Sequence, residues 1–236
     1  MTRVLVVDDD PTVREVVAGY LIRAGLLVDQ ADDGPAALAQ AAAEPPDVVV
    51  LDLMLPGLEG LEVLRRLRAR RGDLPVVLLT ARGEEDDRIL GLQVGADDYV
   101  TKPFSARELV LRVQSILRRT STAIAPEARP LVDGDLRVDP RARTASRGGI
   151  PLALTAREFD LLAHLLGHPE RAFTRTDLLR EVWGWEFGDE STVTVHVRRL
   201  REKVEDDPAA PRRISTVWGV GYRWDPTPAA AIDGMP

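Results

Sequence analysis

The length, composition and charge of this chain exclude several classes of protein. The chain has 236 residues, 44% of them hydrophobic and 29% charged, which is typical of one large or two ordinary globular domains. It has no cysteine, so disulfides, thiolate zinc sites and cysteine nucleophiles are excluded. No run of about 18 apolar residues predicts a membrane span, and residues 1–10 lack the pattern of a signal peptide, so we expect a cytoplasmic protein.

The net charge is similar in the two halves of the chain. Residues 1–120 carry 15 basic and 20 acidic side chains, and residues 121–236 carry the remaining 16 and 18. Neither half is basic overall, so composition alone does not indicate nucleic-acid binding. Nucleic-acid binding would have to be indicated by a local cluster of cations.

The first 120 residues alternate short apolar runs with helical periodicity. The predicted strands are 4–7, 26–28, 48–51, 76–79 and 99–101, and the predicted helices are 12–24, 34–43, 58–70, 84–94 and 105–119. Strands that alternate with helices of this length favour a parallel sheet covered on both faces. Residues 1–120 therefore form, on this prediction, an α/β doubly wound domain with a five-stranded parallel sheet.

The second half has a different organisation. Residues 121–130 are rich in Ala, Pro and Ser and are interpreted as a linker, and residues 226–236 as a disordered tail. Between them, residues 131–225 begin with strand-like pieces and turns. Helices are predicted from the capping patterns at Thr155 and Thr174 and over residues 191–205. A hairpin is predicted around Gly219 and Gly221, so this α+β domain is interpreted as a winged helix-turn-helix.

Polar side chains stand at the ends of the predicted parallel strands. Asp8, Asp9 and Asp10 follow the first strand, Asp52 follows the third, Thr80 closes the fourth, and Lys102-Pro103 closes the fifth. Ligands of open α/β sheets bind at the carboxyl ends of the strands, so these groups are expected to meet in one crevice. Clustered carboxylates suit Mg²⁺, and a carboxylate beside that ion can attack a phosphoryl group. Each residue taken alone has a simpler interpretation, such as a helix cap or a solvated lysine.

The same residues carry a resemblance to a known family. The motifs VVDDDP (6–11), LDLMLPG (51–57), LTAR (79–82) and GADDYVTKPF (95–104) resemble the receiver domain of bacterial two-component response regulators, which has a flavodoxin-like fold. The second half resembles the DNA-binding domain of the OmpR/PhoB subfamily. The resemblance extends from residue 3 to about residue 224.

This resemblance implies a role for each pocket residue. Asp52 is expected to accept a phosphoryl group from the phosphohistidine of a partner sensor histidine kinase. Magnesium would be held by Asp8, Asp9, Asp52 and the backbone carbonyl of Met54. Lys102 would contact the phosphoryl group, Thr80 and Tyr99 would form the switch pair, and the peptide bond before Pro103 would be cis. Slow loss of the phosphoryl group to water is the only other catalysis expected.

The resemblance also implies a homodimer of the phosphorylated protein. The expected ion pairs across its face are Arg88 with Glu108, Asp98 with Arg112, and Asp97 with Arg119. The alternative is an ordinary solvated charged face. Exposed ion pairs contribute only about 0–1 kcal/mol each, so apolar burial has to supply most of the affinity.

The helix predicted over residues 191–205 supplies the cationic cluster that composition lacks. Four cations and one Glu lie between Arg198 and Lys203, which suits phosphates and guanine edges. The alternative is a surface helix with cations near its C-terminus. By resemblance this is the recognition helix, and the hairpin is the wing beside the minor groove of promoter DNA. The expected contacts are Thr192, Thr194, His196, Arg198, Arg199, Arg201, Thr216, Trp218 and Arg223. Trp218 stands where many relatives have Arg, so one contact is expected to be weaker.

The loop before that helix resembles the family's transactivation loop, which can touch RNA polymerase. The residues expected to make that contact are Trp185, Glu186, Asp189 and Glu190.

Three other interpretations remain open on the sequence. An aspartyl phosphatase of the haloacid dehalogenase type also uses an Asp nucleophile and Mg²⁺, but it needs a second Asp where Met54 stands. A constitutive DNA-binding protein would use its first domain for assembly alone. Zinc bound by His164 and His168, which have a helical ligand spacing, is disfavoured because Gly167 and Pro169 end the helix there.

Overall fold

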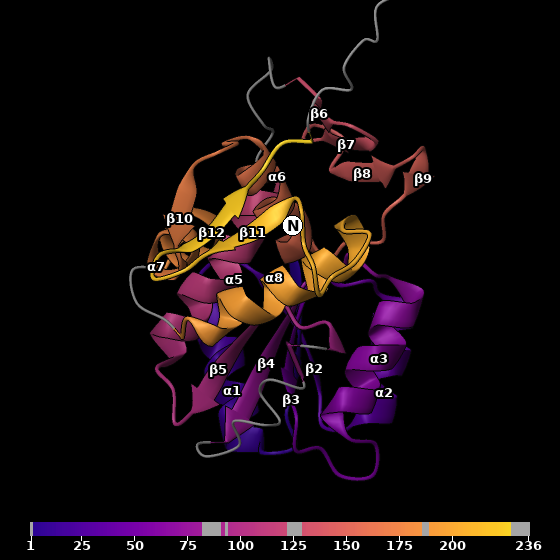
Figure 1. Cartoon of the computed structure of the whole chain (residues 1–236). Helices are drawn as coiled ribbons and strands as arrows, with labels where there is room; N and C mark the ends of the chain where they lie inside the picture. The colour runs from indigo at the N-terminus through magenta and orange to yellow at the C-terminus, as the bar shows by residue number, and fades with distance from the viewer. Residues whose placement is uncertain (1, 82–90, 93, 122–128, 186–188, 228–236) are drawn as a thin grey trace, which may run out of the picture. The chain divides into compact units, whose positions relative to one another are not determined.

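The chain folds into two compact units. The structure, a computed structural model, describes residues 2–81, 91–92, 94–121, 129–185 and 189–227 (Figure 1). Met1–Thr122 makes up nearly all of the first unit, and Ala123–Leu152 with Glu158–Pro236 makes up the second. Most of the helix predicted at 84–94, most of the predicted linker and most of the predicted tail lie outside the described residues.

The first unit is built on a five-stranded parallel sheet. Its strands are β1 (Arg3–Val7), β2 (Leu27–Ala31), β3 (Val48–Asp52), β4 (Val76–Ala81) and β5 (Asp98–Lys102). They lie in the order β2-β1-β3-β4-β5, so the chain reverses its direction of winding between β1 and β3. This order is that of flavodoxin-like folds, and it confirms the predicted sheet.

Helices cover both faces of this sheet because its central strands are apolar on both sides. The described helices are α1 (Pro11–Arg23), α2 (Gly34–Ala43), α3 (Gly60–Arg70) and α5 (Ala106–Ser121). Residues of α1 and α5, such as Leu21 and Val113, share one core with alternate strand residues, such as Val6 and Val50. Figure 1 shows α2 and α3 side by side, away from α1 and α5.

The second unit begins with a four-stranded antiparallel sheet. Its strands are β6 (Leu131–Asp133), β7 (Leu136–Asp139), β8 (Thr144–Arg147) and β9 (Ile150–Pro151), paired in that order. Gly134, Gly148 and Gly149, in the two turns expected from the sequence, have left-handed φ angles of 58°, 57° and 80°. The sequence indicated short strands here but did not predict that they form one sheet.

The rest of the second unit has three helical segments and a three-stranded sheet. The helical segments are α6 (Ala156–Leu166), α7 (Arg175–Leu178) continued by the π-helical turn η1 (Leu179–Trp183), and α8 (Ser191–Val204). The strands β10 (Ala172–Thr174), β12 (Gly221–Trp224) and β11 (Ile214–Val217) pair in that order. The predicted helices and hairpin are thus confirmed as a winged-helix-like arrangement, which adds β10 as a third strand.

Two capping boxes were expected from the sequence, at Thr174 and at Thr155. The Thr174 hydroxyl accepts a hydrogen bond from Asp177 N at 3.0 Å, and Asp177 accepts one from Thr174 N at 3.1 Å, which is a complete capping box. Glu158, three residues after Thr155 in the other expected box, binds two cations of α8. No helix among the described residues is long and apolar enough to cross a membrane.

Candidate functional sites

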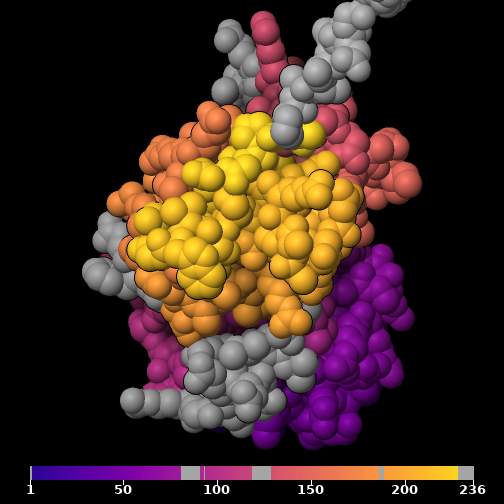
Figure 2. Space-filling view, viewed as in Figure 1, coloured from indigo at the N-terminus to yellow at the C-terminus, as the bar shows by residue number. Residues whose placement is uncertain are grey.

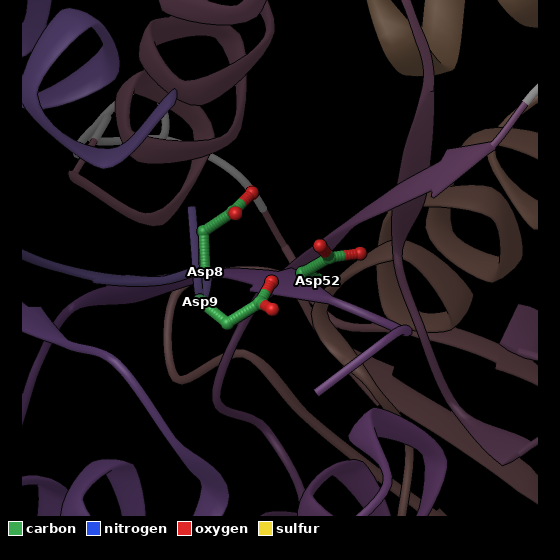
Figure 3. A group of neighbouring side chains, drawn as sticks. All are labelled: Asp8, Asp9 and Asp52. Atoms are coloured by element: carbon green, nitrogen blue, oxygen red, sulfur yellow. The ribbon is translucent and has the colours of Figure 1, made fainter. Parts of the chain in front are cut away.

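Three carboxylates meet at the carboxyl edge of the parallel sheet. Asp8 and Asp9 follow β1 and Asp52 ends β3, and each offers an oxygen within 4.8 Å of the others (Figure 3). Asp8 and Asp52 are buried, whereas Asp9 is exposed. β1 and β3 are hydrogen-bonded neighbours, so the sheet itself brings these acids together. It is the only such cluster of potential metal ligands in the described part of the chain.

Lys102, at the end of β5, is the counter-ion of this cluster. Its Nζ donates to Asp8 Oδ2 at 2.8 Å and to Asp52 Oδ2 at 2.6 Å. Burial raises the pKa of the Asp8 carboxyl; the hydrogen bond from Lys102 opposes this, and the charge of Asp52 adds to it. Burial lowers the pKa of Lys102, but its hydrogen bonds to Asp52 and Asp8 outweigh this, so the pKa is raised and the ammonium stays charged.

Local hydrogen bonds give the consecutive acids after β1 different tasks. Asp10 caps α1, accepting from Thr12 N at 2.8 Å, and this bond lowers the pKa of its carboxyl. Asp8 Oδ1 accepts from Asp10 N at 3.0 Å, and Arg14 donates to the Asp8 carbonyl at 2.6 Å. Asp10 is therefore a helix cap, whereas Asp8 and Asp9 belong to the carboxylate cluster.

Gly60 at the start of α3 is a residue that sequence reasoning missed. A Cβ built there would lie 2.2 Å from the carbonyl oxygen of Asp52, so only glycine allows this close approach of two backbone segments. Its N–H donates to the Leu53 carbonyl at 3.0 Å. A glycine soon after a strand-end Asp was the only available signal, and it is a weak one. Gly60 shapes the segment that follows Asp52, in which Met54 N donates to Asp52 Oδ1 at 3.2 Å.

The remaining pocket residues lie on β4 and β5. Thr80 lies in β4 directly after Leu79, the residue that pairs with Asp52 of β3. Its hydroxyl is buried and has no hydrogen-bond partner among the described residues. Tyr99 lies in β5 beside Leu78 of β4. The Lys102–Pro103 peptide bond is cis, as the resemblance implied.

The donor set of this pocket fits a divalent cation and a phosphoryl group. Three carboxylates face one ammonium, so the cluster holds excess negative charge that a hard cation would offset. The Thr80 hydroxyl has no acceptor among the described residues, and an incoming phosphoryl oxygen would provide one. Both features are unfavourable in a purely structural cluster.

The acids expected at the dimer face have partners within their own unit. Asp97 accepts from Arg68 at 2.5 Å and from Val76 N at 2.9 Å. Arg112 binds Asp98 at 3.2 Å and Glu108 at 2.7 Å. Leu111, on the same helix, is 59% exposed. Arg88 and the side chain of Arg119 lie outside the described residues.

In the second unit, one face of α8 is held by its own domain. Arg199 and Lys203 each lie 2.5 Å from the Glu158 carboxylate of α6. The His196 ring packs edge-on against Trp183 at 5.1 Å, and its Nδ1 lies 2.8 Å from the Thr192 carbonyl. These contacts give Arg199 and His196 a role in holding the helix in place.

Another face of α8 is open to a ligand. Thr194 and Arg198, four residues apart, are exposed. Arg201 lies on the neighbouring side and donates to the Ile214 carbonyl at 2.6 Å and to the Thr216 hydroxyl at 2.9 Å. It therefore ties α8 to β11, and Figure 2 shows the helix and the hairpin forming one continuous surface. At the open end of the hairpin Arg223 is bound to Asp225 at 2.5 Å, and in the turn at its other end Trp218 is 91% exposed.

Two further residues belong to this surface although the sequence did not single them out. The Arg175 guanidinium lies 5.0 Å from the centre of the Tyr222 ring and donates to the Thr194 hydroxyl at 3.3 Å. Tyr222 also lies under Arg201 at 5.7 Å. An Arg that begins a helix and a Tyr in a strand carry no sequence signal of their own, because only the packing of α7, α8 and β12 brings them together.

The loop before α8 is described at its two ends. Trp185 N donates to the Leu179 carbonyl at 3.1 Å, and Asp189 accepts from Ser191 N at 2.7 Å. Glu190 accepts from the Thr176 hydroxyl at 2.9 Å. Glu186 lies outside the described residues.

The two histidines of the helical ligand spacing have partners within the second unit. The His168 Nδ1 lies 2.8 Å from the carbonyl of His164, and the His164 Nε2 lies 3.3 Å from Glu181. The two rings pack against each other and against Phe173 in tilted and edge-on arrangements. These contacts are those of a packed helix end.

Comparison with known proteins identifies relatives for both units. Residues 4–114 match the family described as response regulator receiver domain, and residues 149–224 match transcriptional regulatory protein, C terminal. The chain is 42% identical over 231 residues to the transcriptional regulatory protein ResD of Bacillus subtilis, covering 95% of this chain and 96% of that protein. It is 46% identical over 228 residues to the response regulator MprA of Mycolicibacterium vanbaalenii, covering 96% and 98%. The crystal structure of DrrB, a Thermotoga maritima OmpR/PhoB homologue, is 35% identical with a TM-score of 0.52, covering 95% and 99%.

Proposed function

Because the chain belongs to the OmpR/PhoB subfamily of two-component response regulators, we propose that Asp52 is the residue that accepts the phosphoryl group. The protein is a phosphorylation-dependent, DNA-binding transcription regulator, and its family implies a sensor kinase and DNA as partners. The observation that carries the proposal is the buried Asp52 carboxylate, which ends β3 between Asp8, Asp9 and Lys102.

The chemistry follows from the groups around Asp52. A carboxylate oxygen of Asp52 attacks the phosphorus of a phosphohistidine; the P–N bond breaks, an O–P bond forms, and the imidazole departs with a proton. The Lys102 ammonium, which donates to Asp52 in this structure, then donates to a phosphoryl oxygen. The Thr80 hydroxyl donates to another phosphoryl oxygen. Slow hydrolysis of the resulting acyl phosphate returns the free carboxylate.

Magnesium is the cofactor that fits the cluster. Receiver domains bind Mg²⁺ at such an acidic pocket, and Asp8, Asp9, Asp52 and the Met54 carbonyl would hold it here. When bound, the ion offsets the charge of the carboxylates and of the phosphoryl oxygens. Tyr99 would complete the switch with Thr80.

The output is binding of promoter DNA by the second unit. The exposed stripe of Thr194 and Arg198 supports this, as do the wing residues Thr216, Trp218 and Arg223 beside it. Arg201 is half-buried and Arg199 is buried, so each is proposed to contact DNA only through the atoms that its bonds to Ile214 and Glu158 leave exposed. Thr192 and His196, expected as contacts from the sequence, are fully buried in their own domain, so we propose that they support this surface from within. A DNA partner implies a cytoplasmic location.

Phosphorylation is proposed to act through a homodimer. The exposed Leu111 supplies apolar surface on α5, and Glu108 beside it is exposed. Asp97, Asp98 and Arg112 would exchange some of their present partners for those of the second copy, joined by Arg88 and Arg119. The loop residues Trp185, Glu186, Asp189 and Glu190 are proposed to contact RNA polymerase.

One experiment tests the switch. Purified protein is incubated with acetyl phosphate and Mg²⁺, and phosphoprotein is separated by phosphate-affinity electrophoresis. We expect a shifted band that Asp52→Asn abolishes and that the control Asp73→Asn, at the opposite edge of the sheet, retains.

A second experiment measures DNA binding. Genomic fragments are selected with the purified protein, with and without beryllofluoride as a mimic of the phosphoryl group. Fragment enrichment that ignores beryllofluoride would favour a constitutive DNA-binding protein, and turnover of free phosphomonoesters would favour a phosphatase.

A further inference from the structure

The first turn of α1 contains an arginine whose side chain reaches back over the end of β1. The backbone N–H of Arg14 donates to the Asp10 carbonyl at 3.0 Å, so Arg14 belongs to the helix that Asp10 caps. Long side chains of a helix lean toward its N-terminus. Arg14 Nη1 accordingly donates to the Asp8 carbonyl at 2.6 Å and to the Asp9 carbonyl at 3.4 Å. One nitrogen thus binds the backbone of both acids that β1 contributes to the cluster.

The backbone of Asp8 is held on both sides. Its N–H donates to the Ala31 carbonyl at the end of β2 at 3.3 Å, and its carbonyl accepts from Arg14. The carboxylates of Asp8 and Asp9 lie on the side of Asp52 (Figure 3). Because Asp9 is exposed, few groups of the protein surround it, and the bond from Arg14 restrains the peptide that follows it. Arg14 therefore limits how far the two carboxylates can turn away from the cluster.

The stability of α1 does not explain a cation at this place. The N-terminus of a helix carries a positive partial charge, so a cation in the first turn is unfavourable. Arg23, in the last turn of the same helix, has the favourable location. Arg14 is half-buried, whereas Arg23 is exposed. The two carbonyl oxygens and the nearby carboxylates are the groups that offset the unfavourable location of Arg14.

We propose that Arg14 is a positioning residue for the magnesium site, and this rests on the proposed function of the acidic pocket. Its bonds go to backbone carbonyls and not to the carboxylates, so it acts through Asp8 and Asp9. Mg²⁺ demands a near-ideal arrangement of oxygen ligands, so carboxylates that are held in place before the ion arrives bind it more tightly. Removal of a group that orients metal ligands typically lowers the affinity about 10- to 100-fold.

The charge of Arg14 alone predicts the opposite effect. A cation close to the cluster repels Mg²⁺, so removal of that charge by itself should tighten Mg²⁺ binding. Removal of the two bonds to the backbone should weaken Mg²⁺ binding instead. The direction of the change in affinity therefore separates a positioning arginine from an ordinary charge beside the pocket.

Thermal unfolding of the full-length protein over a series of MgCl₂ concentrations at constant ionic strength gives the Kd for Mg²⁺. Arg14→Ala should raise this Kd about tenfold. Arg14→Lys keeps the charge and one donor group, so its Kd should lie between those of wild type and Arg14→Ala. The matched control is Arg23→Ala, which removes the same charge from the exposed end of the same helix, where Arg23 contacts the Tyr20 ring. Its Kd should stay within about twofold of wild type, because the site is screened from it.

The phosphorylation reaction supplies a second measurement. With acetyl phosphate as donor, Arg14→Ala should need about tenfold more Mg²⁺ for its half-maximal rate. Its maximal rate at saturating Mg²⁺ should stay close to that of wild type, because ordering of the ligands affects binding of the ion and not the attack by Asp52. A lower maximal rate with an unchanged Mg²⁺ requirement would contradict a positioning role.

Other results would overturn the proposal in distinguishable ways. An unchanged or lower Kd for Mg²⁺ in Arg14→Ala would refute the role of Arg14 and leave the proposed function of Asp52 intact. If the unfolding curves show that Arg14→Ala does not fold, Arg14→Lys decides: its Kd should be raised, and a Kd equal to that of wild type would refute the role. Absence of any Mg²⁺ effect on the wild type would refute the proposed magnesium site as well.

Discussion

Buried carboxylates are treated differently in the two units of this protein. In the first unit, Asp8 and Asp52 share one ammonium, that of Lys102, and Asp9 adds a third carboxylate beside them. In the second unit, Glu158 lies between two cations, Arg199 and Lys203. Negative charge therefore exceeds positive charge at the first site, whereas positive charge equals or exceeds negative charge at the second.

Glu205 is a further carboxylate of the second unit that its own domain satisfies. It accepts hydrogen bonds from the backbone N–H groups of Arg212, Arg213 and Ile214, the last at 2.7 Å. A carboxylate with these partners stabilises the fold and has no need of a ligand. Like charges that share one counter-ion destabilise the fold, and such a cluster is typical of a site kept for a ligand.

The largest expected effect on stability concerns Glu205, the carboxylate whose hydrogen bonds come from its own domain. Glu205→Ala should lower the free energy of unfolding by about 3 kcal/mol, because three N–H groups, the one of Ile214 buried and the other two partly buried, lose a charged acceptor. Urea unfolding followed by tryptophan fluorescence measures it, and the exposed Glu202→Ala is the control. A loss no larger than that of the control would mean that Glu205 is not a structural carboxylate.

The acidic pocket should show the opposite behaviour. Asp8→Asn removes a charge from a crowded cluster, so in Mg²⁺-free buffer the variant should unfold at the same or a higher temperature than wild type. Wild type should gain about 2.7 kcal/mol at Mg²⁺ concentrations one hundredfold above its Kd, and the variant should lose most of this gain. Thermal unfolding over a Mg²⁺ series measures both, and a destabilised Mg²⁺-free variant would contradict the excess of charge.

The pH dependence follows from the same cluster. Since burial raises the pKa of Asp8 in the folded state, its contribution to stability is fully present below the pKa of the unfolded chain and is lost as pH rises through the folded pKa. Mg²⁺-free wild type should therefore gain stability relative to Asp8→Asn as pH falls through that window. Parallel curves for the two proteins would show that Asp8 titrates as an ordinary exposed acid.

The smallest effect is expected at the capping box of α7. Thr174→Ala should cost about 1 kcal/mol, the usual value of a lost N-cap. The hydrogen bond from Thr174 lowers the pKa of Asp177, so this stabilisation is present above the ordinary pKa of Asp and is lost as pH falls through the lowered value. Urea unfolding at neutral and acidic pH should show the difference between variant and wild type shrinking in acid.

Sequence reasoning located the pocket because strand ends can be recognised in the chain. Apolar runs predict the strands, and the carboxyl ends of parallel strands lie at one edge, so the positions of Asp8, Asp52 and Lys102 at strand ends were enough to predict that they meet. The three consecutive acids could not be told apart in this way. Asp10 caps α1 while Asp8 and Asp9 face the cluster, because the turn after β1, and not residue type, directs each side chain.

The recognition helix shows the same limit. Its cations at 198, 199 and 201 are equivalent in composition, yet Arg198 is exposed, Arg199 binds Glu158 and Arg201 holds the hairpin. A helix turns by about 100° per residue, so neighbours face different surroundings. What those surroundings contain depends on α6 and β11, which are distant in sequence.

The sequence by itself determined the order of the strands and helices, the two-domain organisation and the acids that line the sheet edge. These features follow from periodicity and from the identity of residues at strand ends, which are local properties of the chain. Only the tertiary structure decided that Gly60 lets α3 begin against Asp52, that Glu158 gathers two cations of α8, and that Trp218 is exposed in the turn of the hairpin. Each of these depends on how segments of the chain pack in three dimensions, which the local pattern of residues does not set.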